Sequence, residues 1–189
     1  MGEEKKLAVL FPGIGYNFDR PLMRFSAEMA RQFGYEVLNV GYTGFPKKII
    51  GNAERLRESF DIAAAQTEKI LKDVQFHDYS DVVFFSKSIG TIVAAQYASK
   101  HGIRAGQVLF TPFPETFSVP MSGKAVAFHG TADPWMDGKA VEKAAADADV
   151  PMYLYPDGNH SLETGDALRD IRTLEDVFGK VKDFLEQVG

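Results

Sequence analysis

Three side chains in this chain have the types and the order needed for nucleophilic catalysis: Ser88, Asp133 and His160. A serine hydroxyl attacks a carbonyl carbon when a histidine removes its proton, and a carboxylate can orient that histidine and stabilise its cation. Each of the three follows a separate short apolar run, and they come in the order Ser, Asp, His. This order differs from those of chymotrypsin and subtilisin. Together the three residues predict a triad that performs acyl transfer.

The segment around Ser88 has the features of a sharp strand-to-helix turn. Such a turn has the pattern Gly-x-Ser-x-Gly, because the central serine is strained and its neighbours two positions away must be small. Here the segment is Ser86-Lys87-Ser88-Ile89-Gly90, so Gly90 fits the pattern and Ser86 departs from it. A helix beginning after Ser88 would offer unpaired amides and a partial positive charge to an oxyanion. The alternative is that Ser88 only caps this helix.

The other two members of the predicted triad also have simpler interpretations. Asp133 precedes Pro134 and could merely shape a turn. His160 lies in the polar loop 156–161 and could be an ordinary surface histidine, although a loop position also suits a general base. Taken singly, neither residue identifies a site. Their joint placement with the serine, each after its own apolar run, favours the triad over independent chance.

A glycine-containing loop after the first apolar run could complete the site. A tetrahedral intermediate needs two amide donors, one from the residue after the nucleophile and one from a neighbouring loop. Gly13 and Gly15 allow the backbone of that loop to approach closely. We therefore predict that the amides of Ile14 and Ile89 form an oxyanion hole. The alternative, a dinucleotide-binding Gly-x-Gly-x-x-Gly loop, fails at Phe18.

Short apolar runs alternate with segments of helical period along the chain. The runs predicted as strands are Leu7–Phe11, Glu36–Val40, Asp81–Phe85, Val108–Phe110, Ala125–Phe128 and Met152–Tyr155. The segments predicted as helices are Asp19–Phe33, a long helix capped by Asn52, Ile92–Ala98, Lys139–Ala148 with Asp137 able to cap it, and a final helix capped by Thr173. Strands alternating with helices predict an α/β fold with a mainly parallel sheet, in which ligands bind at the carboxyl ends of the strands.

Length and composition bound the chemistry further. The 189 residues favour a single domain, 1–189, and the absence of cysteine excludes a cysteine nucleophile and a disulfide framework. A net charge of −5 argues against a nucleic-acid partner. The apolar segments are too short for a secretory signal or a membrane span, so we expect a cytoplasmic protein with no membrane partner. The four histidines show no metal-ligand spacing, so neither a metal nor a cofactor is expected.

The motifs resemble those of the α/β-hydrolase superfamily, nearest in style to its dienelactone-hydrolase-like and small carboxylesterase members. The resemblance runs from about residue 7 to residue 188. It is carried by Phe-Pro-Gly-Ile-Gly at 11–15, Ser-Lys-Ser-Ile-Gly at 86–90, His-Gly-Thr-Ala-Asp-Pro at 129–134 and Gly-Asn-His-Ser at 158–161. It implies a three-layer α/β-hydrolase fold with a reduced sheet of about six strands. The short stretch 111–124, where family members often carry a lid, leaves no room for a cap domain.

Three departures from the family pattern limit what the resemblance implies. The turn begins with Ser86, the oxyanion loop has Pro12 where many members have histidine, and Ser88 stands where dienelactone hydrolases carry cysteine. The reaction of the dienelactone hydrolases is therefore not expected here. The resemblance implies a serine hydrolase that cleaves a small ester or related acyl substrate through an acyl-enzyme.

Several functional alternatives stay open. An acyltransferase or thioesterase would use the same triad, and the departure at Ser86 leaves room for a non-catalytic binding protein of the same fold. A flavodoxin-like or Rossmann nucleotide-binding module is disfavoured by the incomplete glycine pattern. The expected partner is a small-molecule acyl substrate, and the oligomeric state is open.

Substrate contacts are predicted from side chains near the strand ends. The aromatic candidates are Tyr16, Tyr42, Phe113 and Trp135. Arg20 and Lys87 lie near the predicted site and could meet an acidic substrate, but we expect each to be a solvated charge or part of a salt bridge. His129 is expected to be structural.

Overall fold

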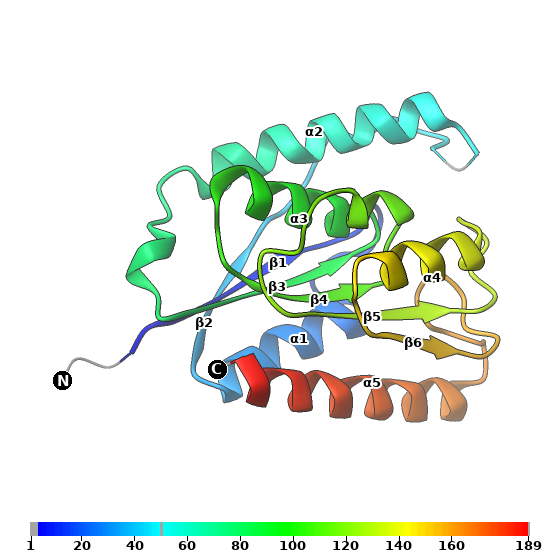
Figure 1. Cartoon of the computed structure of the whole chain (residues 1–189). Helices are drawn as coiled ribbons and strands as arrows, with labels where there is room; N and C mark the ends of the chain where they lie inside the picture. Colours follow the sequence, from blue (N-terminus) through cyan, green and yellow to red (C-terminus); the bar gives the residue numbers. More distant parts are fainter. Residues whose placement is uncertain (1–3, 50, 189) are drawn as a thin grey trace.

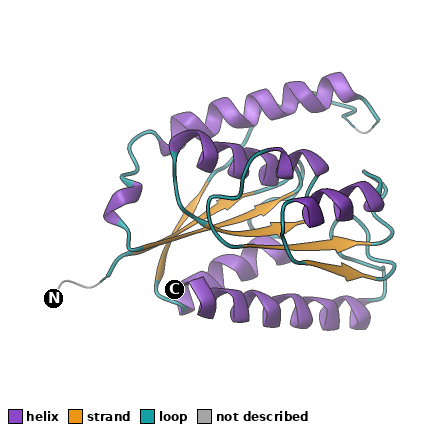
Figure 2. Ribbon diagram, in the orientation of Figure 1, coloured by secondary structure: helices purple, strands orange, loops and turns teal. Residues whose placement is uncertain are grey.

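The computed structural model describes residues 4–49 and 51–188, which form a six-stranded parallel sheet between two layers of helices (Figure 1, Figure 2). The strands are β1 (Lys6–Phe11), β2 (Tyr35–Asn39), β3 (Asp81–Lys87), β4 (Gly106–Phe110), β5 (Ala125–Gly130) and β6 (Met152–Tyr155). The helices are α1 (Pro21–Gln32), α2 (Ala53–Leu71), α3 (Ile89–His101), α4 (Gly138–Asp147) and α5 (Ala167–Val188), with short 3₁₀ turns η1 (Phe76–Asp78) and η2 (Pro114–Ser118).

The strand order is β2-β1-β3-β4-β5-β6, and every neighbouring pair is parallel. Helices α1 and α5 cover one face of the sheet, and α2, α3 and α4 cover the other (Figure 1). The predicted α/β class, with a parallel sheet and helices on both faces, is confirmed. The carboxyl ends of the strands lie together at one edge, and the loops that leave them carry the predicted site.

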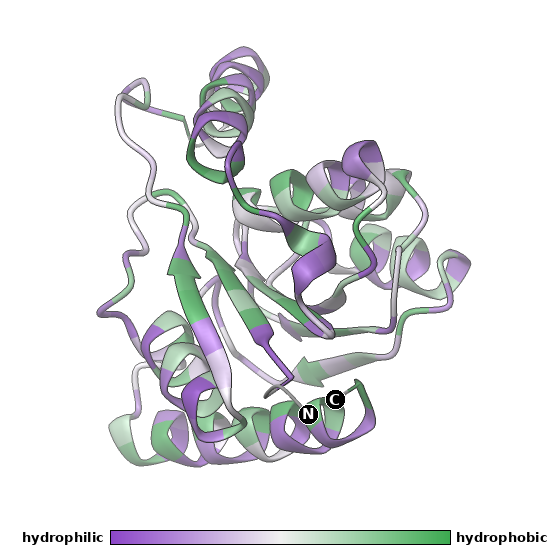
Figure 3. Ribbon diagram, turned by 90° about the vertical axis from the view of Figure 1, so that its left-hand side faces the viewer, coloured by the Kyte–Doolittle hydropathy of each residue, from purple (hydrophilic) through white to green (hydrophobic). Residues whose placement is uncertain are grey.

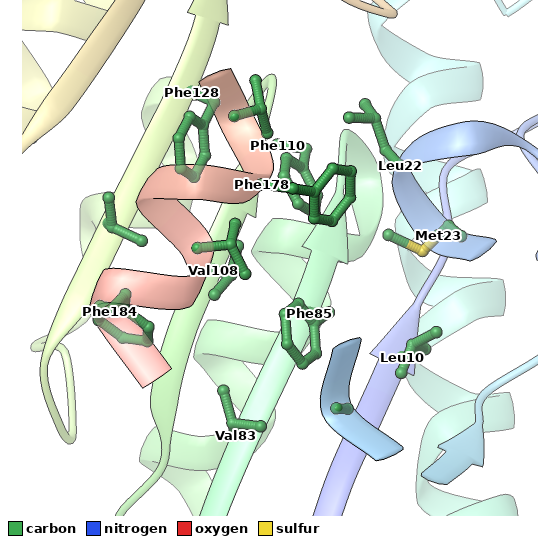
Figure 4. Close-up of a cluster of buried hydrophobic side chains, with 14 of the residues drawn as sticks. Leu10, Leu22, Met23, Val83, Phe85, Val108, Phe110, Phe128, Phe178 and Phe184 are labelled. Carbon is green, nitrogen blue, oxygen red and sulfur yellow. The ribbon is translucent and has the colours of Figure 1, made fainter. Parts of the chain in front are cut away.

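Burial on both faces of the sheet explains the apolar runs that predicted the strands. Successive residues of β3 alternate between two cores. Val83 and Phe85 pack under α1 and α5, while Val82 and Phe84 pack under α2 and α3. Figure 4 shows Phe85 in the first of these cores, and Figure 3 shows the apolar strands enclosed by helices with hydrophilic outer surfaces. The apolar run Val82–Phe85 therefore indicates a central strand that is covered on both faces.

Two of the predicted helix caps are confirmed by their hydrogen bonds. The Asn52 side chain accepts a hydrogen bond from the Arg55 amide at 3.0 Å, at the start of α2. The Asp137 carboxylate accepts one from the Lys139 amide at 3.0 Å, at the start of α4. Each side chain satisfies an amide that has no acceptor within its own helix, which is why these residues set the helix starts.

The predicted start of the last helix at Thr173 is wrong. Helix α5 begins at Ala167, where the Asp166 carboxylate accepts hydrogen bonds from the amides of Leu168 and Arg169, both at 3.0 Å. Leu168 and Ile171 are 66 % and 61 % exposed, so the first turns of the helix bury no apolar stripe. Apolar periodicity therefore appears only after the helix has already begun.

The connection between β3 and α3 is shorter than predicted. Strand β3 continues to Lys87 rather than ending at Phe85, and α3 begins at Ile89 rather than at Ile92. Ser88 is thus the single residue between a buried strand and a buried helix. In the segment between β4 and β5, the described residues form only the short turn η2, in agreement with the expected lack of a cap domain.

No helix in residues 4–49 and 51–188 is both long enough and apolar enough to cross a membrane.

Candidate active site

The turn that carries Ser88 has the strained geometry expected of an exposed nucleophile. Ser88 has a positive φ of 55° with ψ −126°, a conformation that non-glycine residues rarely adopt. A Cβ atom at Gly90 would lie only 2.3 Å from the carbonyl oxygen of Phe11, so only glycine allows α3 to approach β1 this closely. At the position where the pattern has glycine, Ser86 is fully buried and its hydroxyl donates to the carbonyl oxygen of Val108 at 3.3 Å. The sheet thus accommodates the departure at Ser86.

The loops after β5 and β6 bring Asp133 and His160 to this turn. A Cβ atom at Gly130 would lie 2.1 Å from the carbonyl oxygen of Gly158, so the end of β5 meets the loop after β6 at a position that excludes any side chain. His160 Nε2 lies 2.7 Å from Ser88 Oγ, and His160 Nδ1 lies 2.7 Å from Asp133 Oδ2. The three residues predicted from their order in the sequence therefore form one continuous chain of hydrogen bonds.

Burial favours the neutral form of His160 that a general base needs. Burial lowers the pKa of His160, and the charge of Lys87 lowers it further, although the hydrogen bond to Asp133 opposes both. Burial would raise the pKa of Asp133, but the hydrogen bond and charge of His160 outweigh burial and hold that pKa below its ordinary value. An ionised Asp133 accepts a hydrogen bond from Nδ1–H, which leaves the unprotonated Nε2 free to take the hydroxyl proton of Ser88.

Ile89 directly follows Ser88, and the loop that carries Ile14 packs against Ser88. Ile89 is the first residue of α3, so its amide has no acceptor within the helix. The loop that carries Ile14 turns back on itself through a hydrogen bond from the Tyr16 amide to the Gly13 carbonyl oxygen, at 3.2 Å. A Cβ atom at Gly13 would lie 3.1 Å from the Cβ atom of Ser88, so this loop packs directly against the serine. The oxyanion role of the two amides stays a prediction.

Of the four aromatic residues predicted to contact substrate, two lie against His160 and two do not. The Trp135 ring stacks on His160 with centroids 5.2 Å apart, and the buried Phe113 ring meets His160 edge-on at 6.1 Å. Tyr16 is buried beneath the site, where its hydroxyl accepts a hydrogen bond from the Leu22 amide.

Tyr42 is not brought to the histidine. Its hydroxyl lies 3.5 Å from Thr67 of α2, and its ring packs against Phe45. Of the four predicted aromatic residues, Trp135 and Phe113 therefore flank the histidine.

The expectation that Lys87 is solvated or salt-bridged is wrong. The residue is 2 % exposed, and its ammonium donates to the carbonyl oxygen of His160 at 2.8 Å and to Thr111 Oγ1 at 3.3 Å. A strand prediction that ended at Phe85 missed this, because the buried strand continues two residues further. Thr111 was not predicted at all. Arg20, in contrast, is exposed and pairs with Glu163 at 3.7 Å, as expected.

His129 is buried beside the carboxylate of the candidate triad. Its Nδ1 lies 4.0 Å from Asp133 Oδ2, and burial lowers its pKa. Within the described residues neither ring nitrogen has a hydrogen-bond partner. The described part of the chain also contains no group of three or more His, Asp or Glu side chains that could hold a metal ion.

Comparisons with known proteins give a fold. No protein-family model matches the chain, and no curated protein does either. Est1E from Butyrivibrio proteoclasticus, solved with ferulic acid bound, superposes with a TM-score of 0.71 at 13 % identity, covering 99 % of this chain and 90 % of that one. An esterase of Pyrococcus furiosus superposes with a TM-score of 0.68 at 14 % identity, covering 99 % and 84 %.

A third solved structure is an α/β serine hydrolase without a lid from Xanthomonas campestris. It superposes with a TM-score of 0.66 at 13 % identity, covering 99 % of this chain and 84 % of that one. Similarity at this level of identity establishes the fold and leaves the activity to be argued from the site. The chain has the α/β-hydrolase fold over nearly its whole length, and the resemblance inferred from its motifs is confirmed at that level.

Proposed function

We propose that the chain is a serine hydrolase that cleaves a small ester or related acyl substrate through an acyl-enzyme. The observation that carries the proposal is the unbroken hydrogen-bond chain from Ser88 through His160 to Asp133, with both contacts at 2.7 Å. This is the geometry in which a histidine can remove a serine proton while a carboxylate fixes its tautomer. The backbone strain at Ser88 adds support, because such strain gathers at functional sites.

In the proposed first half-reaction, Ser88 Oγ attacks the acyl carbonyl carbon while its proton moves to His160 Nε2. Asp133 stabilises the imidazolium, and the amides of Ile14 and Ile89 donate to the developing oxyanion. One such donor is typically worth about 2.7–4 kcal/mol. The imidazolium then protonates the departing alcohol, which leaves the acyl group on Ser88.

In the second half-reaction, water replaces the alcohol. His160 takes a proton from the water as it attacks the acyl carbon, and the oxyanion forms again in the same hole. The intermediate collapses as His160 returns the proton to Ser88 Oγ, which releases the carboxylic acid. The enzyme ends in its starting protonation state.

The comparisons support a hydrolase of this kind. The structures that the chain resembles include an esterase and an α/β serine hydrolase without a lid. The Trp135 and Phe113 rings, which flank His160, are the side chains we expect to contact the acyl or alcohol group. A small substrate is proposed because the segment 111–124 offers only a short turn to cover it.

A fluorophosphonate probe, which reacts with activated serines, tests this proposal. We expect the folded protein to be labelled at Ser88 and to hydrolyse short p-nitrophenyl esters, while Ser88→Ala does neither and keeps its circular dichroism spectrum. Folded wild-type protein that is neither labelled nor active on esters from acetate to octanoate would contradict the proposal. Equal labelling of wild type and Ser88→Ala would contradict it as well.

A further inference from the structure

Lys87 is a buried cation whose contacts are not explained by the fold. It is 2 % exposed, its ammonium lies over the ring of Tyr16 at 4.7 Å, and it donates to the His160 carbonyl oxygen and to Thr111 Oγ1. No carboxylate among the described residues lies within ion-pair distance of it. Burying a charge without a carboxylate partner is costly, and hydrogen bonds to neutral oxygens repay only part of that cost. A lysine kept in such a place calls for a functional explanation.

Thr111, which contacts both Lys87 and the His160 carbonyl oxygen, has a strained backbone. Thr111 follows β4, is fully buried and has a positive φ of 44°, which is rare for a β-branched residue. Its hydroxyl donates to the His160 carbonyl oxygen at 3.2 Å while accepting from Lys87. Strain of this kind persists only where the surrounding contacts hold it in place. The carbonyl of His160 is thus held by two buried side chains, one from the last residue of β3 and one from the residue after β4.

The position of Lys87 in the chain makes it a direct link between the two halves of the site. It immediately precedes Ser88, so the same residue that aims the turn also holds the loop after β6 through the carbonyl of His160. Any displacement of that loop must break a charge-assisted hydrogen bond, which is stronger than a neutral one.

We propose that Lys87 is a positioning residue for His160: its ammonium fixes the His160 backbone relative to Ser88, and its charge keeps the imidazole neutral. This inference rests on the proposed function of the triad. Lys87 touches neither the Ser88–His160 hydrogen bond nor the substrate in the proposed mechanism, and it acts only through His160. Lys87, the second residue of the Ser-Lys-Ser-Ile-Gly turn, would thus have a role in positioning the histidine.

The charged groups around Lys87 and His160 determine how the lysine charge changes the proton affinity of the histidine. Burial lowers the pKa of Lys87 to about 7, while Asp133 and Glu163 favour its charged form and Arg20 opposes it. The phenol of Tyr16 faces it from the loop after β1.

On the side of His160, the ionisable neighbours are Asp133, which favours the imidazolium, and Lys87 and His129, which oppose it. Removal of the Lys87 charge therefore raises the proton affinity of His160. A lysine that acted through packing alone would leave that affinity unchanged.

Two substitutions separate the hydrogen bond from the charge. Lys87→Met keeps the length and apolar character of the stem and removes both the donor and the charge. Lys87→Gln keeps a neutral donor and removes only the charge. Lys143→Met is the matched control, because Lys143 is exposed on α4, pairs with Asp147 and changes the net charge by the same amount.

Two measurements on the full chain test the proposal. The first is the pKa of His160, followed by NMR of ¹³C-labelled histidine, with the His160 resonance assigned by its loss in His160→Gln. The second is the rate of fluorophosphonate labelling of Ser88 as a function of pH. We expect Lys87→Met to raise the His160 pKa, to move the acid limb of labelling to higher pH and to slow labelling on the plateau at least tenfold. Lys87→Gln should show the same change in pKa with a smaller loss of rate, and Lys143→Met should match wild type.

The outcomes distinguish this proposal from the one it rests on. An unchanged His160 pKa in folded Lys87→Met overturns the inference, and so does an unchanged labelling rate on the plateau. A slower plateau without any change in pH dependence also overturns it, because lost packing alone would produce that result. If the wild type is not labelled at all, the proposed function fails, whereas the NMR titration still decides whether Lys87 acts on His160.

Discussion

The two ends of the parallel sheet hold their polar groups in different ways. At the carboxyl end, Lys87, Ser88 and Thr111 are buried, and the last two have positive φ angles. At the amino end, the partly exposed Glu68 side chain forms an ordinary ion pair with the exposed Lys100 at 2.6 Å. Buried charge and strained backbone both cost free energy, whereas an exposed ion pair costs little and contributes little. The carboxyl end is therefore the one built for chemistry.

Cavity size would lead to the opposite conclusion. A hollow of about 1040 Å³ lies at the amino end of the sheet, where Tyr79, Tyr97 and His101 are among its lining residues. Figure 3 looks onto this end of the molecule, where β1 begins and α5 ends. The hollow lies at the opposite end of the strands from Ser88, and in the described part of the chain no hydroxyl group is hydrogen-bonded to His101, the histidine that Glu68 contacts there. In a fold whose ligands bind at the carboxyl ends of the strands, buried polar contacts locate the site better than volume does.

The largest effect should come from removing the nucleophile. We expect Ser88→Ala to lower kcat for a p-nitrophenyl ester by about 10⁴–10⁶-fold. The corresponding change at the amino end, Glu68→Gln, removes an exposed ion-pair partner and should change kcat less than twofold. If Glu68→Gln lost as much activity as Ser88→Ala, the contrast between the two ends would be wrong.

The next largest effect should come from the carboxylate. Asp133→Asn keeps the shape of the side chain, but the amide can present a donor to Nδ1 and so hold His160 in the wrong tautomer. We expect kcat to fall by about 10³–10⁴-fold, by analogy with the same change in serine proteases. Asp137→Asn, which alters only the cap of α4, is the matched control and should keep its rate in the same assay. Equal rates for Asp133→Asn and wild type would exclude a triad.

A stability measurement should separate the buried lysine from an exposed one. We expect Lys87→Met to raise the free energy of unfolding at pH 7 by about 1–4 kcal/mol, because a buried charge is replaced by an apolar side chain of similar size. Lys143→Met should change it by less than about 1 kcal/mol. Urea denaturation at a single protein concentration measures both. A less stable Lys87→Met protein would show that the ammonium contributes net stability.

The pH dependence of that difference follows from the lowered pKa of Lys87. The folded protein releases the lysine proton near pH 7, whereas the unfolded chain keeps it to about pH 10.5. Because the unfolded state binds more protons in this window, Lys87 makes wild-type stability rise with pH from about 7 to 10.5. The advantage of Lys87→Met should therefore be greatest at and below pH 7 and shrink above it.

The smallest expected effect is the pH dependence of the wild-type reaction near neutrality. His160 must be neutral to accept the serine proton, and its pKa lies below the ordinary value of 6.5. The value of kcat/KM should therefore be near its maximum at about pH 8, fall to half at a pH below 6.5, and approach a tenfold loss per pH unit well below the His160 pKa. A half-maximal value of kcat/KM at a pH above 6.5 would contradict the environment described for His160.

The sheet and the approach of the three triad residues can be predicted from the sequence, because a strand buried on both faces has a run of apolar residues without polar alternation. The run Val82–Phe85 has no polar residue, and such a run belongs in the middle of a parallel sheet. Once the strands are placed, their carboxyl ends must meet at one edge, and the order Ser88, Asp133, His160 then predicts which side chains approach one another. The helix caps Asn52 and Asp137 were predictable for a similar reason, since a local hydrogen bond decides them.

The features that the sequence did not predict depend on tertiary contacts. Lysine is almost always exposed, so a strand predicted from its apolar residues ends before Lys87. The fold nevertheless buries Lys87 against the carbonyl oxygen of His160, 73 positions away in the chain. Tyr42 follows a strand as expected, but the side to which its ring turns depends on how α2 packs. Thr111 has no local signal, because its positive φ is imposed by partners from other strands.

The bare backbone contact between Gly130 and Gly158 has a consequence for how this protein can vary. A single added methyl group at position 130 would push the β5 and β6 loops apart, and with them the two residues that meet at 2.7 Å. A mutational scan scored by activity would rank Gly130 beside Asp133 and His160, although it carries no functional group. Positions where two main chains are in contact would then be as intolerant to substitution as the residues of the proposed triad.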